Sequence, residues 1–563
     1  MINFRGKKIN MFFSQNRAWA FIVFVLFFIL AIFFTRIPFG NIGSVLPTDG
    51  DPMLVSYIWS WEMEMLPNDP LNLFHANIFY PFKYTLLFTE HMLGSLVLAW
   101  PLFLIFNNIM MSFNLVSLLS FAIGGLGMYL LLEYLTKNKY VAVIGAFIYA
   151  FAPFKIHHLE HINLGGMWLP YVFLWLRKFL NENTWRNILL LTFFVALSFL
   201  NGLQYFIFLC VCIFLIFFSD YLLNKFKLSR NNLLKMGLCF LIFLFLVAPI
   251  AWSYISMGQE FDFNRAIGSI EGLSPDLVDY FISPFVYKYF YPVFFPEWAI
   301  GPGWFVLILF FFSSWFIFKK RQELVFRTII YYIIGILAVL FSFGYYIQLT
   351  RADTFGLMGP WAFFYHFVPG ADGIRVLGRF SIFFLIASCI IISYGLSEFF
   401  DSIVKKHWKK LLITLFIISL LAFEFSFAHP RHYASIGQPC SAIYEWVNDQ
   451  NDDNVYLEMP MGIDHLRRNY NALHEYCSIG VFHKTVNGYS GYAPDDYTEL
   501  NKELFKFNSE DVDFVLNYGV THIIFHFDCY AESYKEYLIN EIEKNEYVEL
   551  VKIEDNDYVY KIN

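Results

Sequence analysis

Long apolar runs recur along the first three quarters of the chain and predict helices that cross a lipid bilayer. The runs lie at residues 18–36, 90–107, 112–134, 139–154, 165–180, 186–202, 203–223, 233–255, 302–318, 326–346, 378–400 and 410–428. Short polar segments separate most of them, and the segments 139–154 and 165–180 are short for a crossing. This pattern predicts an α-helical polytopic membrane protein with about 11–13 transmembrane helices.

The hydrophobic pattern changes near residue 429. Partly alternating segments such as "NVYLEMP", "THIIFHF" and "YVELVKI" predict strands, and "CSAIYEWVND" and "SYKEYLINEIEKN" predict helices between them. We therefore expect a water-soluble α/β domain at 429–563. Residues 1–428 form the expected transmembrane domain, with a long first outer loop at 37–89.

Basic clusters orient the chain, because cytoplasmic loops are enriched in Lys and Arg. The clusters "RKFLNENTWR", "NKFKLSR", "FKKRQ" and "KKHWKK" alternate with loops that are poor in both residues. This places the N-terminus inside, and the first loop and the C-terminal domain outside, in the cytoplasmic (inner) membrane. Twelve crossings would end inside, so one segment between 90 and 180 is expected to be re-entrant or interrupted.

Composition agrees with a membrane protein and excludes several other classes. Of 563 residues, 58% are hydrophobic and only 15% charged. The net charge of −7 and the lack of a basic patch argue against nucleic acid as a partner. Walker, Rossmann and G-x-S-x-G motifs are missing, which disfavours nucleotide-driven and serine chemistry. In the polar C-terminal part, Cys440, Cys477 and Cys529 allow one disulfide without requiring it.

Two carboxylates follow the first apolar run, in "LPTDGDPML" at residues 46–54. The amphipathic, aromatic segment after them is expected to lie in the membrane interface and hold Asp49 and Asp51 against the helix bundle. They suit an acid/base centre or a cation site. The alternative is an ordinary turn in which an Asp caps a helix that starts near Pro52. Glu90 and His91, at the start of the next apolar run, are further site candidates, although Glu90 also suits a helix cap.

The segment "FAPFKIHHLEHINLGG" contains His157, His158 and His161. On a helix, His157 and His161 would share one face, an arrangement that binds metals, although the H-E-x-x-H order is not met. The same residues suit a phosphate ligand. They also suit an interfacial position with no ligand.

The segment "VPGADGIRVLGRFSIFF" places Arg375 and Arg379 four residues apart at the outer entrance of an apolar helix. On one helix face, two guanidinium groups suit a diphosphate or a lipid phosphate. Anchoring to lipid headgroups is the alternative. Arg265, in "FDFNRAI", is a weaker candidate in another outer loop.

Several of these motifs, in order, resemble a group of bacterial multi-spanning proteins placed near the C-type (GT-C) glycosyltransferase superfamily, with the protein O-mannosyltransferases and the aminoarabinose transferase. The motifs are "GDPMLVSYIWSWEMEML", "FHANIFYPFKYTLLFTEHMLG", "FAPFKIHHLEHINL", "VPGADGIRVLGRF" and "NGYSGYAPDDY". The resemblance implies a GT-C-like fold and a polyprenyl-phosphate sugar donor. It also implies a catalytic base in the first outer loop, which falls on Asp51 or Asp49, with the Asp-Pro pair favouring Asp51. Arg375 and Arg379 would then suit the donor phosphate. In the mannosyltransferases Asp and Glu are adjacent, whereas here Pro52 follows Asp51.

These features together predict an inverting glycosyltransferase in the bilayer that transfers a sugar to an envelope glycan, lipid or protein. A transporter or flippase of lipid-linked glycans and a non-catalytic scaffold are the alternatives. A transporter would place ionisable residues near the bilayer midplane, where the apolar runs have few. A divalent cation on Asp49 and Asp51 stays open, because the superfamily includes metal-dependent and metal-free members.

Overall fold

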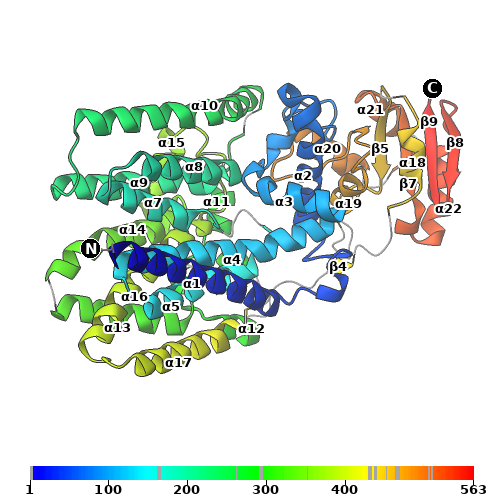
Figure 1. Ribbon diagram of the computed structural model, residues 1–563. Coiled ribbons are helices and arrows are strands. Elements are labelled where there is room, and N and C mark those ends of the chain that lie inside the picture. Colours follow the sequence, from blue (N-terminus) through cyan, green and yellow to red (C-terminus); the bar gives the residue numbers. More distant parts are fainter. Residues whose placement is uncertain are drawn as a thin grey trace. The chain divides into compact units, whose positions relative to one another are not determined.

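The computed structural model describes residues 4–161, 166–261, 263–290, 296–320, 322–350, 353–428, 434–435, 440–451, 453–462, 469–504, 507–508 and 511–563. Helices dominate these residues, and a small sheet lies in the C-terminal part (Figure 1). The chain forms two compact units, which are described separately. Unit 1 comprises Met1–Phe39, Leu115–Pro249 and Phe263–Arg431, and unit 2 comprises Gly40–Asn114, Ile250–Asp262 and His432–Asn563.

Each of the twelve apolar runs coincides with a helix, as the hydropathy pattern predicts. They are α1 (Phe4–Thr35), α3 (Leu93–Phe106), α4 (Ile109–Thr136), α5 (Lys139–Phe151), α7 (Leu169–Asn181), α8 (Trp185–Asn201), α9 (Leu203–Leu222), α10 (Arg230–Glu260), α13 (Trp304–Lys320), α14 (Gln322–Ser342), α16 (Ser381–Ser402) and α17 (His407–Phe425). Seven segments of the described residues are long and apolar enough to cross a bilayer, and three further apolar helices are shorter. The prediction of a multi-pass membrane protein is confirmed.

Unit 1 is built around α16, which is almost entirely buried and packs against α5, α13 and α14. Small residues let these helices approach closely, as is common within membranes. A Cβ atom on Gly395 would lie 2.4 Å from the Cβ of Ser313, so α13 and α16 need glycine there. Short helices and a hairpin connect the long ones: α6 (Pro153–His157), α11 (Ile267–Leu273), α12 (Pro284–Phe290), α15 (Pro360–Phe367), β2 (Tyr346–Thr350) and β3 (Asp353–Met358).

Unit 2 contains a five-stranded mixed sheet in the order β6-β5-β7-β9-β8 (Figure 1). The strands are β5 (Val455–Met459), β6 (Lys484–Thr485), β7 (His522–His526), β8 (Val548–Glu554) and β9 (Asp557–Ile562). The first three pair in parallel, whereas β9 runs antiparallel to both β7 and β8. The helices are α18 (Ile443–Asn448), α19 (Tyr470–Cys477), α20 (Asp495–Glu503), α21 (Asp511–Leu516) and α22 (Glu532–Ile542). The α/β character expected for the C-terminal part is confirmed.

The first loop packs within unit 2 against the C-terminal part of the chain. Its helix α2 (Asp51–Asn68) contacts α19, and β1 (Val45–Leu46) pairs with β4 (Ala434–Ser435). The backbone N–H of Phe79 donates to Asn487 O at 3.0 Å. A disulfide joins Cys440 to Cys477, and Cys529 lies outside it.

Candidate active-site residues

Asp51 is the first residue of α2, and Gly50 is its N-cap. Gly50 has a φ of 108°, a left-handed conformation that favours glycine, and a Cβ there would lie 3.3 Å from the Tyr489 hydroxyl. The N-cap residue itself offers no side chain, and Asp49 is exposed. The turn alternative expects an Asp as the cap, whereas Gly50 holds the N-cap position.

The Asp51 carboxylate is half-buried and oriented by Tyr489. The phenolic hydroxyl of Tyr489 donates to Asp51 Oδ1 at 2.7 Å. The start of a helix is also a favourable place for a negative charge, because its N–H groups form the positive end of the helix dipole. A carboxylate held in this way is suited to accept a proton from a nearby hydroxyl.

A second carboxyl contacts the backbone of Tyr489. Glu475, in α19, is fully buried and its Oε2 accepts a hydrogen bond of 3.2 Å from the backbone N–H of Tyr489. Burial raises the pKa of Glu475 well above its usual range, and this hydrogen bond opposes the rise without cancelling it. Glu475 thus supports the Tyr489 backbone from a buried position.

Glu90 and His91 precede α3, which begins at Leu93. His91 is fully buried, and its Nδ1 lies 3.1 Å from the Tyr254 hydroxyl. Burial lowers the pKa of His91 to about 3. His91 is thus a neutral core histidine at physiological pH, whereas Glu90 is only partly buried.

In unit 1, two polar side chains converge on Glu297, in the 3₁₀ turn Pro296–Trp298. His158 Nε2 lies 3.2 Å from Glu297 Oε2, and Arg379 Nη2 lies 3.0 Å from Oε1. Gln204 adds to this cluster: its Oε1 accepts from Arg379 Nη1 at 3.4 Å, and its Nε2 donates to Val376 O. These contacts fix the Arg379 guanidinium at the start of the α16 segment.

The electrostatics of this cluster favour the ionised form of Glu297. Burial alone would raise the pKa of the carboxyl, but Arg379 and His158 outweigh burial and hold the pKa well below its usual range. His158 Nδ1 also lies 2.8 Å from Phe154 O, an acceptor. Both ring nitrogens of His158 thus face acceptor oxygens.

Two predictions about helical spacing are wrong. Arg375 and Arg379 do not stack on one helix face, because regular structure begins only at Leu377 and leaves Arg375 exposed on the preceding loop. Likewise, α6 ends at His157, so His157 and His161 do not lie one helical turn apart. His161 lies 3.9 Å from Glu160 instead.

Arg265 has a role in holding the loop that carries Arg375. Its backbone N–H donates to Asp372 O at 3.0 Å, and its Nε lies 3.5 Å from Gly373 O. The Tyr365 hydroxyl in turn donates to Arg265 O at 2.8 Å. Through these contacts Arg265 stabilises the loop at Asp372 and Gly373, within unit 1.

The sequence interpretation missed Tyr489, Glu297 and Gln204 as site residues. Tyr489 lies in the "NGYSGYAPDDY" motif, but nothing in the motif pairs it with a residue 438 positions away. Glu297 is the single acidic residue of the aromatic stretch "YFYPVFFPEWAI". An isolated charge among aromatics is the signal that could have pointed to Glu297.

Comparison with known proteins is informative at the level of structure. No protein-family model matches the chain, and no curated protein matches it by sequence. Arabinofuranosyltransferase AftD from Mycobacteria matches 97% of this chain with a TM-score of 0.57 and 11% sequence identity. The match covers 40% of AftD, so this chain spans about two fifths of that protein.

A second match is the archaeal oligosaccharyltransferase AglB from Archaeoglobus fulgidus, solved with an inhibitory peptide and a dolichol-phosphate. It covers 91% of this chain and 69% of AglB, with a TM-score of 0.50 and 12% identity. The fold of this chain is therefore similar to the folds of these two glycosyltransferases, in agreement with the sequence resemblance.

Proposed function

We propose that this protein is a membrane glycosyltransferase that moves a sugar from a polyprenyl-phosphate donor to a cell-envelope acceptor. The single observation that carries the proposal is the Asp51 carboxylate at the start of α2, held by Tyr489 at 2.7 Å. The GT-C-type fold supports it, because AftD is an arabinofuranosyltransferase and AglB an oligosaccharyltransferase bound to a dolichol-phosphate.

In the proposed reaction Asp51 is the general base. An acceptor hydroxyl attacks the anomeric carbon of the donor and gives its proton to the Asp51 carboxylate. The bond between the anomeric carbon and the phosphate oxygen breaks, and the polyprenyl phosphate leaves with that oxygen. Attack opposite the leaving group inverts the anomeric configuration. Tyr489 positions the carboxylate by occupying Oδ1.

Arg379 and His158 are the proposed cations for the departing phosphate. Arginine binds phosphate oxygens through a planar fork, and charge that develops on a leaving group is stabilised by fixed donors. Glu297 keeps both side chains in place before the donor binds. We expect Arg379→Gln to raise the KM for the donor by about tenfold or more, because a charged hydrogen bond contributes about 1.5–3 kcal/mol.

The disulfide between Cys440 and Cys477 supports the outer placement of the C-terminal part. Disulfides persist in oxidising compartments such as the bacterial periplasm and are rare in the cytosol. The proposed location is therefore the cytoplasmic membrane, with the N-terminus inside and the C-terminal part outside. The basic loops favour the same orientation.

A transporter of lipid-linked glycans is the competing function. A transporter would need charged groups within the helix bundle. Among the described residues, one buried ion pair joins Arg177 of α7 to Asp220 of α9 at 3.1 Å, and both residues lie near the C-terminal ends of their helices. The Tyr331 hydroxyl accepts from Arg177 Nε at 2.7 Å. This buried pair is internally satisfied, as expected of a structural contact rather than of a transport site near the midplane.

Purified protein in vesicles with a panel of radiolabelled polyprenyl-phosphate sugars separates the two functions. A transferase yields labelled acceptor and free polyprenyl phosphate, whereas a transporter moves the intact lipid between leaflets and yields neither. Transfer to a supplied envelope extract supports the proposal. Lipid movement without transfer contradicts it. The same assay with and without a chelator tests the divalent cation considered for Asp49 and Asp51.

A further inference from the structure

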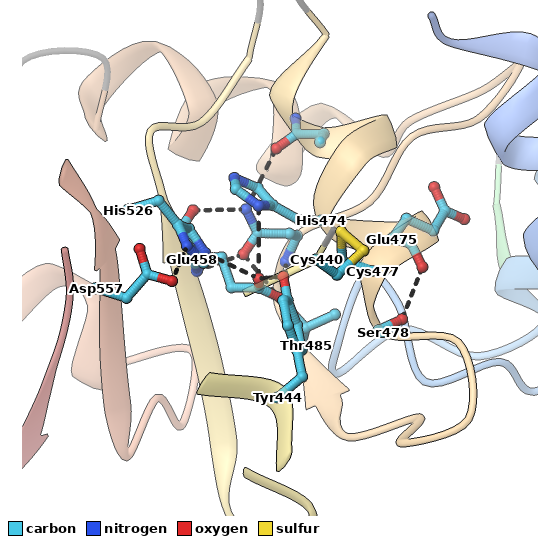
Figure 2. Close-up of polar contacts among 12 residues, drawn as sticks. Cys440, Tyr444, Glu458, His474, Glu475, Cys477, Ser478, Thr485, His526 and Asp557 are labelled. Carbon is cyan, nitrogen blue, oxygen red and sulfur yellow. Dashed lines mark hydrogen bonds and ion pairs between the residues drawn. A yellow bond between two sulfur atoms is a disulfide. The ribbon is translucent and has the colours of Figure 1, made fainter. Parts of the chain in front are cut away.

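A buried cluster of histidines surrounds one carboxylate in the C-terminal part of unit 2 (Figure 2). Glu458 is the fourth of the five residues of β5 and is fully buried. His474 from α19 and His526 from the end of β7 are buried and approach the same carboxylate oxygen. His483, which precedes β6, approaches the other oxygen. The cluster is separate from Asp51 and plays no part in the proposed transfer.

The ligand atoms are spaced as in a tetrahedral metal site. His526 Nε2 lies 3.3 Å and His474 Nδ1 lies 3.5 Å from Glu458 Oε2, and all three atoms fall within 4.8 Å of one another. Zinc bonds of about 2.0–2.1 Å in a tetrahedron place neighbouring ligand atoms about 3.3 Å apart. The three ligand atoms are therefore close enough together to share one cation.

The second ring nitrogen of each histidine is occupied as metal-binding histidines require. His474 Nε2 lies 3.1 Å from Pro460 O, and His526 Nδ1 lies 3.0 Å from Asp557 Oδ2. A carbonyl and a carboxylate both accept, so His474 Nε2 and His526 Nδ1 carry protons, and the other ring nitrogen of each histidine faces Glu458 Oε2. Metal-bound histidines almost always donate their outer N–H to such a partner.

The carboxylate is likewise oriented by neighbours. The Tyr444 hydroxyl donates to Glu458 Oε2, and His483 Nε2 lies 3.1 Å from Oε1. Without a proton or a cation between them, the nitrogen lone pairs of His474 and His526 would face an acceptor oxygen inside the protein, an arrangement that costs free energy. One metal ion would replace the proton that each of these two contacts otherwise needs.

We propose that Glu458, His474 and His526 bind one transition-metal dication, and that Zn²⁺ is the ion that suits the donor set. Two imidazoles and one carboxylate match zinc and related first-row ions rather than Mg²⁺ or Ca²⁺, which prefer oxygen ligands. The site is closed, since all three ligands are buried. It is therefore a structural site that ties β5 and β7 of the sheet to α19, next to the Cys440–Cys477 disulfide (Figure 2).

The metal content of the purified full-length protein tests this proposal. Protein made without a polyhistidine tag in zinc-supplemented medium should contain about one Zn²⁺ per chain by mass spectrometry. X-ray absorption should show only nitrogen and oxygen ligands at about 2.0–2.1 Å. A chelator should lower the unfolding temperature, and added Zn²⁺ should restore it.

Substitutions of the proposed ligands test whether the zinc binds at this cluster. His474→Gln combined with His526→Gln should reduce bound zinc at least tenfold, whereas His522→Gln, on the same strand but outside the cluster, should retain it. Asp557→Asn should weaken zinc binding about 10- to 100-fold in a competition titration with a chromophoric chelator, which remains measurable if the double variant does not fold. Wild-type protein with less than a tenth of an equivalent of metal and an unfolding temperature unaffected by Zn²⁺ would overturn the proposal. Full zinc content in the double variant would also overturn it.

Discussion

The hydroxyl of Tyr489 donates a 2.7 Å hydrogen bond to Oδ1 of Asp51, a residue 438 positions earlier in the chain. This bond connects the C-terminal part of unit 2 to the first residue of α2. It gives the C-terminal part a direct role in orienting the proposed base.

Removal of that hydroxyl should slow transfer. A hydrogen bond to a charged group contributes about 1.5–3 kcal/mol, so Tyr489→Phe should lower kcat by about 10- to 100-fold and leave the donor KM nearly unchanged. Steady-state transfer assays check both constants. Tyr537→Phe, at an exposed position of α22, is the matched control. Equal kcat values for Tyr489→Phe and wild type would show that Tyr489 does not position the base.

Glu297 should stabilise unit 1 in a pH-dependent way. Burial opposes its ionisation, but Arg379 and His158 hold its pKa well below the usual 4.5. A depressed pKa contributes stability above pH 4.5, and that contribution is lost as the pH falls below 4.5 through the folded-state pKa. Glu297→Gln leaves the partly buried Arg379 guanidinium without its carboxylate, so it should lower the stability of unit 1 at pH 7.

Thermal unfolding in detergent across pH 3–8 measures this effect. The gap between wild type and Glu297→Gln should be widest at neutral pH and shrink below pH 4.5. Glu323→Gln, which alters an exposed pair with Arg327, should have little effect at any pH. A gap that does not change with pH would mean that the ionised form of Glu297 is not the stabilising species.

The ionised form of Glu62 should destabilise the fold, in contrast to that of Glu297. It lies in α2 with no exposed surface, and neither carboxylate oxygen has a hydrogen-bond partner in the described part of the chain. Burial raises its pKa well above 4.5. The unfolded chain therefore ionises first as the pH rises above 4.5, and stability falls by about 1.4 kcal/mol per pH unit until the folded-state pKa is reached.

Glu62→Gln removes this penalty. The variant should unfold at the same temperature as wild type near pH 4 and at a higher temperature at pH 8. Glu64→Gln, two residues further along α2 and exposed, provides the comparison. If the Glu62→Gln variant is less stable than wild type at pH 8, the ionised Glu62 carboxylate must be stabilised by a neighbouring group, and the prediction is wrong.

The membrane helices could be predicted because a bilayer imposes a simple rule on sequence. Apolar runs long enough to cross must form helices, since lipid offers no partner for backbone groups. The strands β5, β7 and β9 could be predicted from short, partly alternating apolar segments. The mixed order of the sheet could not, since pairing between distant strands leaves no local pattern.

The site was harder to predict than the fold. The helical spacing assumed for Arg375 and Arg379 fails because the chain enters the helix only at Leu377. The contacts of Asp51 and Glu297 depend on tertiary packing, and no spacing in the sequence encodes them. Glu458 could be noticed in the sequence, because it is a charged residue inside a strand that is otherwise apolar.

Transfer by the Asp51→Asn variant, with Asp49→Asn as control, tests the central claim most directly. Both would be reconstituted with a polyprenyl-phosphate sugar that wild type uses, and donor binding would be measured on the same samples. If Asp51 is the base, the Asp51→Asn variant binds donor normally but its kcat falls by at least about 10²-fold, the usual contribution of general-base catalysis. The Asp49→Asn variant, which is altered at an exposed side chain, transfers at nearly the wild-type rate. Wild-type transfer by a folded Asp51→Asn variant would contradict the account.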